Sequence, residues 1–421
     1  MNGFPLIIAL LGLAVGSTVV DADSLPATAP EMVGMSSERL VHLTKILKDE
    51  VESRRLPGAV LAISRKGKLV YFESVGFLHA QAKTPMPRDA IFSIASMTKP
   101  MVSVAAMILH DEGRLLLSDP VAKYLPALAD MRVVAPETDD VATSTLKADR
   151  QPTIHDLLTH MSGFSYAGNR TEAHKKWPAS SATAARTYTG SEFIDIMSEA
   201  PLLHQPGALW DYSLSVDVLG LVIETVAGTS LGHFMDERLW KPLGMVDTAF
   251  AVPTAKRSRY AQPLPNDPLT GADQSMLHQS KEPLKFECGG GCAVSTAMDY
   301  LRFAQMLANK GSLDGHRILL RKTVELMTSD QIAHDVRERS SYSILAQGHS
   351  FGLGLAVRTH SAPTALAGSV GDFGWGGASG TYFWVDPQEE LAVVFMAATP
   401  SEIRNHFRAL VRNLVLASIM D

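Results

Sequence analysis

A serine and a lysine that lie close together in the sequence could carry nucleophilic chemistry. They are Ser96 and Lys99, the ends of a Ser-Met-Thr-Lys tetrad. Residues three positions apart share one face of a helix, so the Lys99 amine can approach the Ser96 hydroxyl. A hydroxyl needs a neighbouring base, and a dry position near a helix N-terminus is expected to lower the pKa of Lys99 towards a useful value. Because such tetrads are common by chance, the interpretation depends on other motifs.

A tyrosine and a glycine-rich segment offer further groups for acyl transfer. Tyr212 lies in a turn-rich stretch after Pro206 and Gly207, where a phenol can act as a general base. The glycines of segment 374–380 allow the backbone to approach a ligand closely, and one backbone N–H can form half of an oxyanion hole. Taken alone, Tyr212 also fits a half-buried core ring, and the glycines fit an ordinary tight hairpin.

Two other patterns could suggest different chemistry. The segment 348–352 matches G-x-S-x-G, which would make Ser350 a nucleophile. That motif works only on a strand-to-helix elbow, whereas a strand pattern follows Ser350, so we expect this serine to be structural. His155 and His160 lie five positions apart and do not share a helix face, and H-E-x-x-H is absent. We expect both histidines to be polar helix positions, and no metal site is predicted.

Strand patterns gather near both ends of the chain, and helical patterns fill its middle. The expected strands cover 58–64, 69–77, 351–359, 380–386 and 391–398, and the expected helices include 37–55, 96–112 and 401–420. This order predicts an α+β protein in which 31–118 and 343–421 share one sheet, with 119–342 as an inserted, mainly helical subdomain. A cleft between the two parts would be the natural binding site.

The composition is that of a globular protein with a substantial core, with 46% hydrophobic residues and a formal net charge of −6. The basic residues are scattered, so nucleic acid is not an expected partner. Residues 5–16 form an apolar run of signal-peptide length that is too short to span a bilayer. We therefore expect 1–22 to be a signal peptide and the protein to be periplasmic or secreted. Because 1–4 carry no Lys or Arg, a cytoplasmic protein with a poorly ordered N-terminus is the alternative.

The two cysteines of the chain, Cys288 and Cys292, flank three glycines. Two thiols without nearby histidines do not form a zinc site. The geometry of a disulfide is demanding across so short a loop. We expect free thiols in a tight glycine turn, with a short-loop disulfide as the alternative in an exported protein.

Motifs in a fixed order run along nearly the whole chain. They are LPGAVLAI from Leu56, IFSIASMTKP from Ile91, DEGRLLLSDPVAKYLP from Asp111, IHDLLTHMSG from Ile154, YSL from Tyr212, PLGM from Pro242, GGG from Gly289, STAMDYLRFAQML from Ser295, FGLG from Phe351 and GWGG from Gly374. Together they resemble the family VIII carboxylesterases, within the superfamily of class C β-lactamases and penicillin-binding proteins. The resemblance implies a β-lactamase/transpeptidase-like fold with an antiparallel sheet. It also implies an acyl-enzyme on Ser96, with Lys99 and Tyr212 transferring the proton and no cofactor or metal.

The chain departs from the β-lactamase pattern at two motifs. Leu214 stands where β-lactamases carry the Asn of Tyr-x-Asn, and Trp375, Gly376 and Gly377 stand where they carry Lys-Thr-Gly. The resemblance makes these four residues the substrate-binding candidates, and it makes the backbone N–H groups of Ser96 and Ala378 the oxyanion hole.

An aromatic wall in place of a cation favours neutral acyl groups. We therefore expect a serine esterase acting on short-chain carboxylic esters, and weak cephalosporin hydrolysis as a side activity is left open. The alternatives are a class C-like β-lactamase or DD-peptidase, an acyltransferase of the same fold, and a sensor that is acylated without turnover. The partner in the leading interpretation is a small ester, and the oligomeric state is left open.

Overall fold

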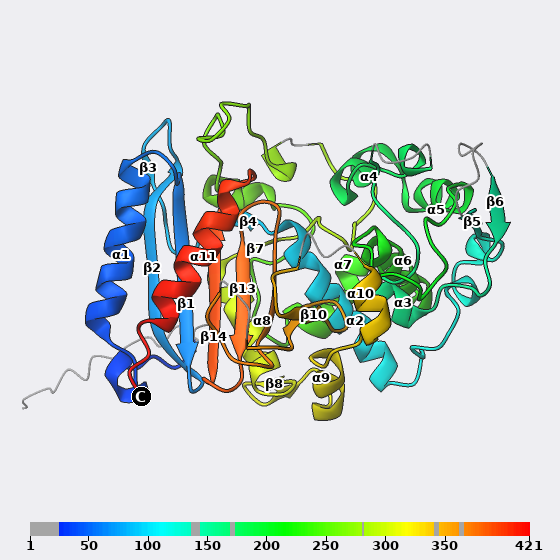
Figure 1. Cartoon of the computed structure of the whole chain (residues 1–421). Helices are drawn as coiled ribbons and strands as arrows, with labels where there is room; N and C mark the ends of the chain where they lie inside the picture. The colour runs from blue at the N-terminus through cyan, green and yellow to red at the C-terminus, as the bar shows by residue number, and fades with distance from the viewer. Residues whose placement is uncertain (1–24, 136–143, 169–172, 280–281, 341–344, 362–365) are drawn as a thin grey trace, which may run out of the picture.

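The computed structural model describes residues 25–135, 144–168, 173–279, 282–340, 345–361 and 366–421. Two layers of helices enclose a central sheet at one end of the molecule, and a mainly helical region forms the other end (Figure 1). The predicted signal peptide, 1–22, lies outside the described residues. Its existence and the localisation stay predictions.

An eight-stranded sheet contains strands from both ends of the chain. Its order is β10 (His349–Phe351), β11 (Ala356–Arg358), β12 (Phe373–Gly376), β13 (Tyr382–Asp386), β14 (Leu391–Ala397), β1 (Gly58–Arg65), β2 (Lys68–His79) and β3 (Thr84–Pro85). All neighbouring strands in it are antiparallel. Strands from the first and last parts of the described chain therefore share one sheet, and the predicted α+β class with an antiparallel sheet is confirmed.

The central strands are buried on both faces because helices cover each side. Ala59, Leu61 and Ile63 of β1 pack with α1 (Ser37–Glu52) and α11 (Ile403–Leu416), while the intervening Val60 and Ala62 join the larger core on the other face. Helices α2 (Thr98–Asp111) and α8 (Ala297–Ala308) belong to that larger core. This double covering explains the near-continuous apolar sequences of β1 and β14, which would otherwise alternate.

The middle of the chain is mainly helical among the described residues. Its helices are α3 (Ile154–Thr159), α4 (Ser181–Thr187), α5 (Gly190–Glu199), α6 (Ser215–Ala227), α7 (Leu231–Met235), η6 (Asp236–Trp240), α9 (Arg321–Met327) and α10 (His334–Arg339). Short two-stranded ribbons join β4 (Phe92–Ser93) to β7 (Val294–Ser295), β5 (Arg132–Val134) to β6 (Thr145–Lys147), and β8 (Ser312–Leu313) to β9 (His316–Arg317).

One expectation about the elements needs correction. The predicted strand 351–359 is a tight hairpin of β10 and β11, because Gly354 has a φ of +87° and the chain reverses there. Helix α8 falls within the predicted insertion, 119–342, but packs on β13, β14 and β1 of the sheet. The inserted part therefore shares a core with the sheet, and the domain boundaries stay a proposal.

In the described part of the chain, no single helix has the length and apolar composition needed to cross a membrane. One pair bent at a break, α6 with the segment Leu231–Trp240, meets that test when its two halves are taken together.

Candidate active site

Ser96 lies in the single 3-10 turn η2 (Ala95–Met97), directly before α2. Its neighbour Ala95 has a φ of +43°, in the left-handed region that costs a non-glycine residue about 1 kcal/mol. The turn is held by Thr98, whose Oγ1 donates to the Ala95 carbonyl at 2.7 Å, and by Tyr300, whose hydroxyl donates to the Met97 carbonyl at 2.8 Å. These contacts fix a strained turn that keeps Ser96 partly exposed at the start of the helix.

Lys99 follows one turn later and is only 1% exposed. Its Nζ lies 3.5 Å from the Ser96 Oγ, 3.2 Å from the Tyr166 hydroxyl and 2.6 Å from the Gly290 carbonyl oxygen. It also lies 4.6 Å from the centre of the Tyr212 ring. The structure thus brings Ser96, Lys99 and Tyr212 together, with the lysine donating to two oxygens besides the serine.

The expected lowering of the Lys99 pKa is wrong for this structure. Burial acts to lower the pKa of Lys99, but interactions with Tyr166, Tyr212 and Asp217 outweigh it and the net shift is upward. Lys99 is therefore an ammonium at neutral pH in this state. A proton leaving Ser96 needs an acceptor within the tyrosine–lysine group rather than the lysine alone.

An unforeseen carboxylate stands behind Lys99. Asp217, fully buried in the first turn of α6, accepts hydrogen bonds from the Gly290 N–H and the Ser181 hydroxyl, both at 2.8 Å. The Gly290 peptide thus links the Asp217 carboxylate to the Lys99 ammonium. A Cβ on Gly290 would lie 2.3 Å from an Asp217 oxygen, so this contact requires glycine. Burial raises the pKa of Asp217, and the nearby Lys99 acts against that shift.

A disulfide closes the loop that carries Gly290. Cys288 and Cys292 are bonded to each other and fully buried, so the expectation of free thiols is wrong. The two Cα atoms lie 5.2 Å apart, which is within the usual range for a disulfide even across so short a loop. The bond restrains the backbone that holds Lys99.

Tyr212 lies in the turn before α6, with its hydroxyl accepting a hydrogen bond from Trp375 Nε1 at 3.2 Å. Its ring packs 4.5 Å from that of His160 and 5.3 Å from that of Trp375, measured between centroids. Residues from two separate elements, His160 at the end of α3 and Trp375 of β12, therefore fix the direction of the phenol. Trp375 meets Tyr212 from β12, so the aromatic wall and the tyrosine form one unit.

His160 differs from its expected role as a polar helix position. It caps α3 in the left-handed conformation, is fully buried, and shares a hydrogen bond with the Ser213 hydroxyl at 3.2 Å. Burial, with a further contribution from Lys99, holds the pKa of His160 well below its usual value. The imidazole is neutral and supports the Tyr212 ring.

Tyr166 was also missed at the sequence level. Its hydroxyl accepts a hydrogen bond from Lys99, and removal from water raises its pKa to about 12. It follows the motif that ends at Gly163, and the φ of +87° at that glycine turns the chain back towards Lys99. A turn glycine just before a tyrosine was the available signal, but nothing in the spacing pointed to Lys99.

The glycine-rich segment 374–380, called the glycine loop below, lies directly against the turn that carries Ser96. A Cβ on Gly377 would meet the Ile94 carbonyl oxygen at 2.1 Å, and Thr381 Oγ1 donates to the same oxygen at 3.2 Å. The Gly377 N–H donates to the Thr381 carbonyl at 2.9 Å, and the next residue, Ala378, is exposed. The loop thus presents Ala378 beside the turn of Ser96, where two backbone N–H groups can face one oxyanion.

Two sequence candidates lie apart from this cluster. Leu214 is fully buried in the core at the start of α6, so its side chain is not available as a substrate contact. Ser350 is buried within β10 and donates to Asp330 Oδ1 at 2.5 Å, which agrees with a structural role. Among the described residues, no group of three His, Cys, Asp or Glu side chains could hold a metal ion.

Comparisons with known proteins identify the family and the fold of the chain. The family model described as Beta-lactamase matches residues 43–417. An uncharacterised protein of Mycobacterium tuberculosis is 34% identical over 83% of this chain and 88% of its own length. Esterase EstB of Burkholderia gladioli is 29% identical over 86% of this chain and 90% of its own. The solved structure of EstCE1, described as a hydrolase with promiscuous acyltransferase activity, has the same fold. It gives a TM-score of 0.72 at 23% identity, over 90% of this chain and 98% of that one.

Proposed function

The chain belongs to the beta-lactamase family of serine hydrolases, and within it we propose a carboxylesterase that forms an acyl-enzyme on Ser96. The observation that carries the proposal is that Lys99 contacts Ser96, Tyr166 and Tyr212 at the same time. The likeness to an esterase over most of the chain supports the same reaction class.

The proposed reaction has two halves. The Ser96 oxygen attacks the ester carbonyl carbon, and its proton passes to the Tyr212–Lys99 pair, which titrates as a unit. The N–H groups of Ser96 and Ala378 hold the oxyanion. The pair then protonates the departing alcohol, which leaves the acyl group on Ser96. In the second half, water gives its proton to the same pair and attacks the acyl carbon. The bond from that carbon to the Ser96 oxygen then breaks, the pair returns the proton to Ser96, and the acid is released.

The substrates we propose are esters with short, neutral acyl groups. Trp375 donates a hydrogen bond to Tyr212 and stands in the strand beside the nucleophile, where related β-lactamases carry a lysine. No ammonium on this strand attracts a substrate carboxylate. Turnover of p-nitrophenyl acetate should therefore exceed turnover of a chromogenic cephalosporin. Adding a short alcohol to the same assay would detect transfer of the acyl group in place of hydrolysis.

The kinetic test compares two serine variants. Ser96→Ala should reduce hydrolysis of p-nitrophenyl acetate at least about 10³-fold, because no acyl-enzyme can form. Ser350→Ala is the matched control and should retain activity per folded molecule. Full activity of Ser96→Ala would contradict the proposal. Loss of activity in Ser350→Ala but not in Ser96→Ala would contradict it as well.

A further inference from the structure

A cavity lies behind the glycine loop, between the sheet and α11. It measures about 240 Å³, and its polar lining includes His349, Asp372, Asn405, Arg408 and Arg412. Ser96, Lys99 and Tyr212 are not among the residues that line it. Gly376 leaves room for the Arg408 guanidinium, because a Cβ there would lie 2.6 Å from its Cζ. Trp375 and Gly376 do line it, so the cavity adjoins the proposed ester site across β12 without including the nucleophile.

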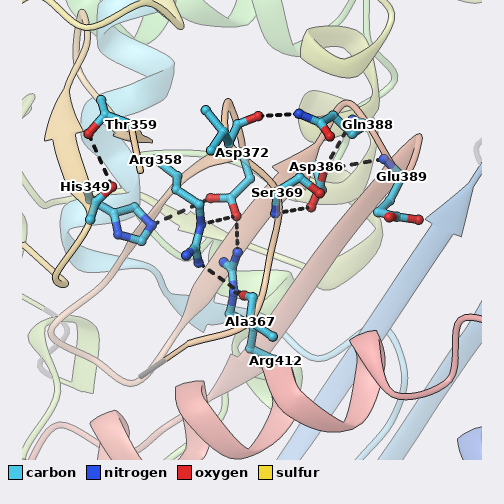
Figure 2. A network of polar contacts seen from close by, with 12 residues as sticks. His349, Arg358, Thr359, Ala367, Ser369, Asp372, Asp386, Gln388, Glu389 and Arg412 are labelled. Carbon is cyan, nitrogen blue, oxygen red and sulfur yellow. Dashed lines mark hydrogen bonds and ion pairs between the residues drawn. The ribbon is translucent and has the colours of Figure 1, made fainter. Parts of the chain in front are cut away.

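Positive charge exceeds negative charge around this cavity. The Asp372 carboxylate is shared by Arg358 Nε at 2.8 Å and by Arg412 (Figure 2). Arg408 forms no ion pair among the described residues, since Glu402 on the same helix pairs with Arg404 instead. The segments 341–344 and 362–365, next in sequence to the lining residues Leu345 and Leu366, contain no Asp or Glu.

Two arginine N–H groups beside the cavity are buried without a partner. They are Arg358 Nη1 and Arg408 Nε, and Arg358 itself is only 1% exposed. Burial lowers the pKa of Arg408 to about 10, and Arg404 adds to the shift. Arg408 is half-buried, and a cation partly removed from water with an unused donor is stabilised when an anion compensates it. The arrangement therefore favours a bound anion.

The remaining walls restrict what that anion can be. Leu345, Ala346, Ala356, Leu366 and Trp384 supply apolar surface. A cavity below the size of drug-binding pockets admits only a small molecule. A guanidinium binds a carboxylate through charge-assisted hydrogen bonds. A short-chain carboxylate satisfies both the cation and the apolar walls, whereas inorganic phosphate leaves those walls uncovered.

We propose that this cavity is a binding site for a short-chain carboxylate, held by Arg408 with its alkyl group against the aliphatic side chains of Leu345, Ala356 and Leu366. Arg408 also donates to the Gly377 carbonyl and, at 3.2 Å, to the Thr381 carbonyl. An occupant of the cavity therefore contacts the residue that braces the glycine loop.

The test uses the full chain with Ser96→Ala, so that no ester chemistry contributes and the result is independent of the proposed function. Butyrate, the neutral butyramide and inorganic phosphate are titrated by calorimetry. Butyrate should bind saturably with a dissociation constant below ~50 mM. Butyramide should show no saturable binding, because only the carboxylate pairs with Arg408.

Two further variants locate the bound molecule. Ala409→Phe fills the cavity without removing a guanidinium, and Arg408→Gln removes the cation; each should weaken butyrate at least about tenfold. Unchanged butyrate binding in a folded Ala409→Phe protein would overturn the site. Equal binding of butyramide, tighter binding of phosphate, or no butyrate binding would overturn the carboxylate assignment.

Discussion

At the residue scale, two tyrosines contact one lysine but differ in their surroundings. Tyr212 accepts a hydrogen bond from Trp375 and faces the glycine loop, whereas Tyr166 accepts one from Lys99 and its pKa is raised to about 12. Tyr212 is the stronger candidate for proton transfer, and Tyr166 is a positioning residue for Lys99.

This difference predicts unequal effects of removing the two hydroxyls. Tyr212→Phe should lower kcat for p-nitrophenyl acetate by about 10²–10⁴-fold, the usual effect of losing a general base. Tyr166→Phe should lower it by only about tenfold, because Gly290 still holds Lys99. Tyr71→Phe is the matched control, because the Tyr71 hydroxyl lies on the opposite face of the sheet and is hydrogen-bonded to Thr44. If Tyr212→Phe left kcat unchanged and Tyr166→Phe lowered it strongly, Tyr166 rather than Tyr212 would be the residue that transfers the proton.

The sequence was a good guide to the reacting residues and a poor one to their supports. Ser96 and Lys99 share a helix turn, so their proximity follows from spacing alone. Asp217 and Tyr166 reach Lys99 only through the packing of the segments around α3, α4 and α6, which no local pattern encodes. The raised pKa of Lys99 likewise depends on groups distant in sequence.

At the element scale, the loop between Cys288 and Cys292 connects the disulfide to the catalytic lysine. A disulfide closing a loop this short is expected to stabilise the fold by about 2 kcal/mol. The double replacement of Cys288 and Cys292 by Ser should lower the free energy of unfolding by about that amount. It should also reduce kcat, because the Gly290 carbonyl is less firmly placed.

Thiol titration gives an independent check on this disulfide. The denatured, unreduced protein should show no reactive thiol, and reduction should release both. Two reactive thiols without reduction would contradict the disulfide. Unchanged kcat after the double replacement of Cys288 and Cys292 by Ser would show that this loop does not affect catalysis.

Helix α8 contains a carboxylate whose ionisation opposes folding. Burial raises the pKa of Asp299 from 3.8 to about 6, against the effect of its hydrogen bonds from Asp247 and Thr248. Because the folded pKa is the higher one, the protonated form favours folding at low pH, and this stabilisation is lost as pH rises through about 6.

Replacing Asp299 by Asn removes this ionisation while keeping an oxygen acceptor. The difference in free energy of unfolding between Asp299→Asn and the wild type should change by about 3 kcal/mol between about pH 4 and pH 8, in favour of the variant at the higher pH. Urea denaturation at several pH values measures it. A difference between the two proteins that does not change with pH would contradict the raised pKa.

At the scale of the whole molecule, the broad architecture could be predicted because patterning and chain order determine it. Strands at both chain ends implied one shared sheet, which the structure shows (Figure 1). The hairpin of β10 and β11 was missed because Gly354 interrupts an otherwise strand-like sequence. The place of α8 against the sheet was missed because its apolar face does not identify the surface it covers.

The long-range features of the molecule were beyond a reading of local sequence. Arg408 reaches the glycine loop only because α11, the last helix, packs over β12 and β13. The cavity behind that loop exists because glycines at 374 and 376 leave the sheet surface open there. Neither feature has a motif, since each depends on elements that are brought together by folding.

The central claim is that one serine, at the junction of the sheet and the inserted helices, carries the acyl group. Labelling the full chain with a fluorophosphonate, followed by peptide mapping with mass spectrometry, tests it most directly. We predict a single stoichiometric adduct on the peptide containing Ser96, its absence in Ser96→Ala, and loss of esterase activity in proportion to labelling. An adduct on Ser350 or another serine, or full esterase activity in completely labelled protein, would contradict the account.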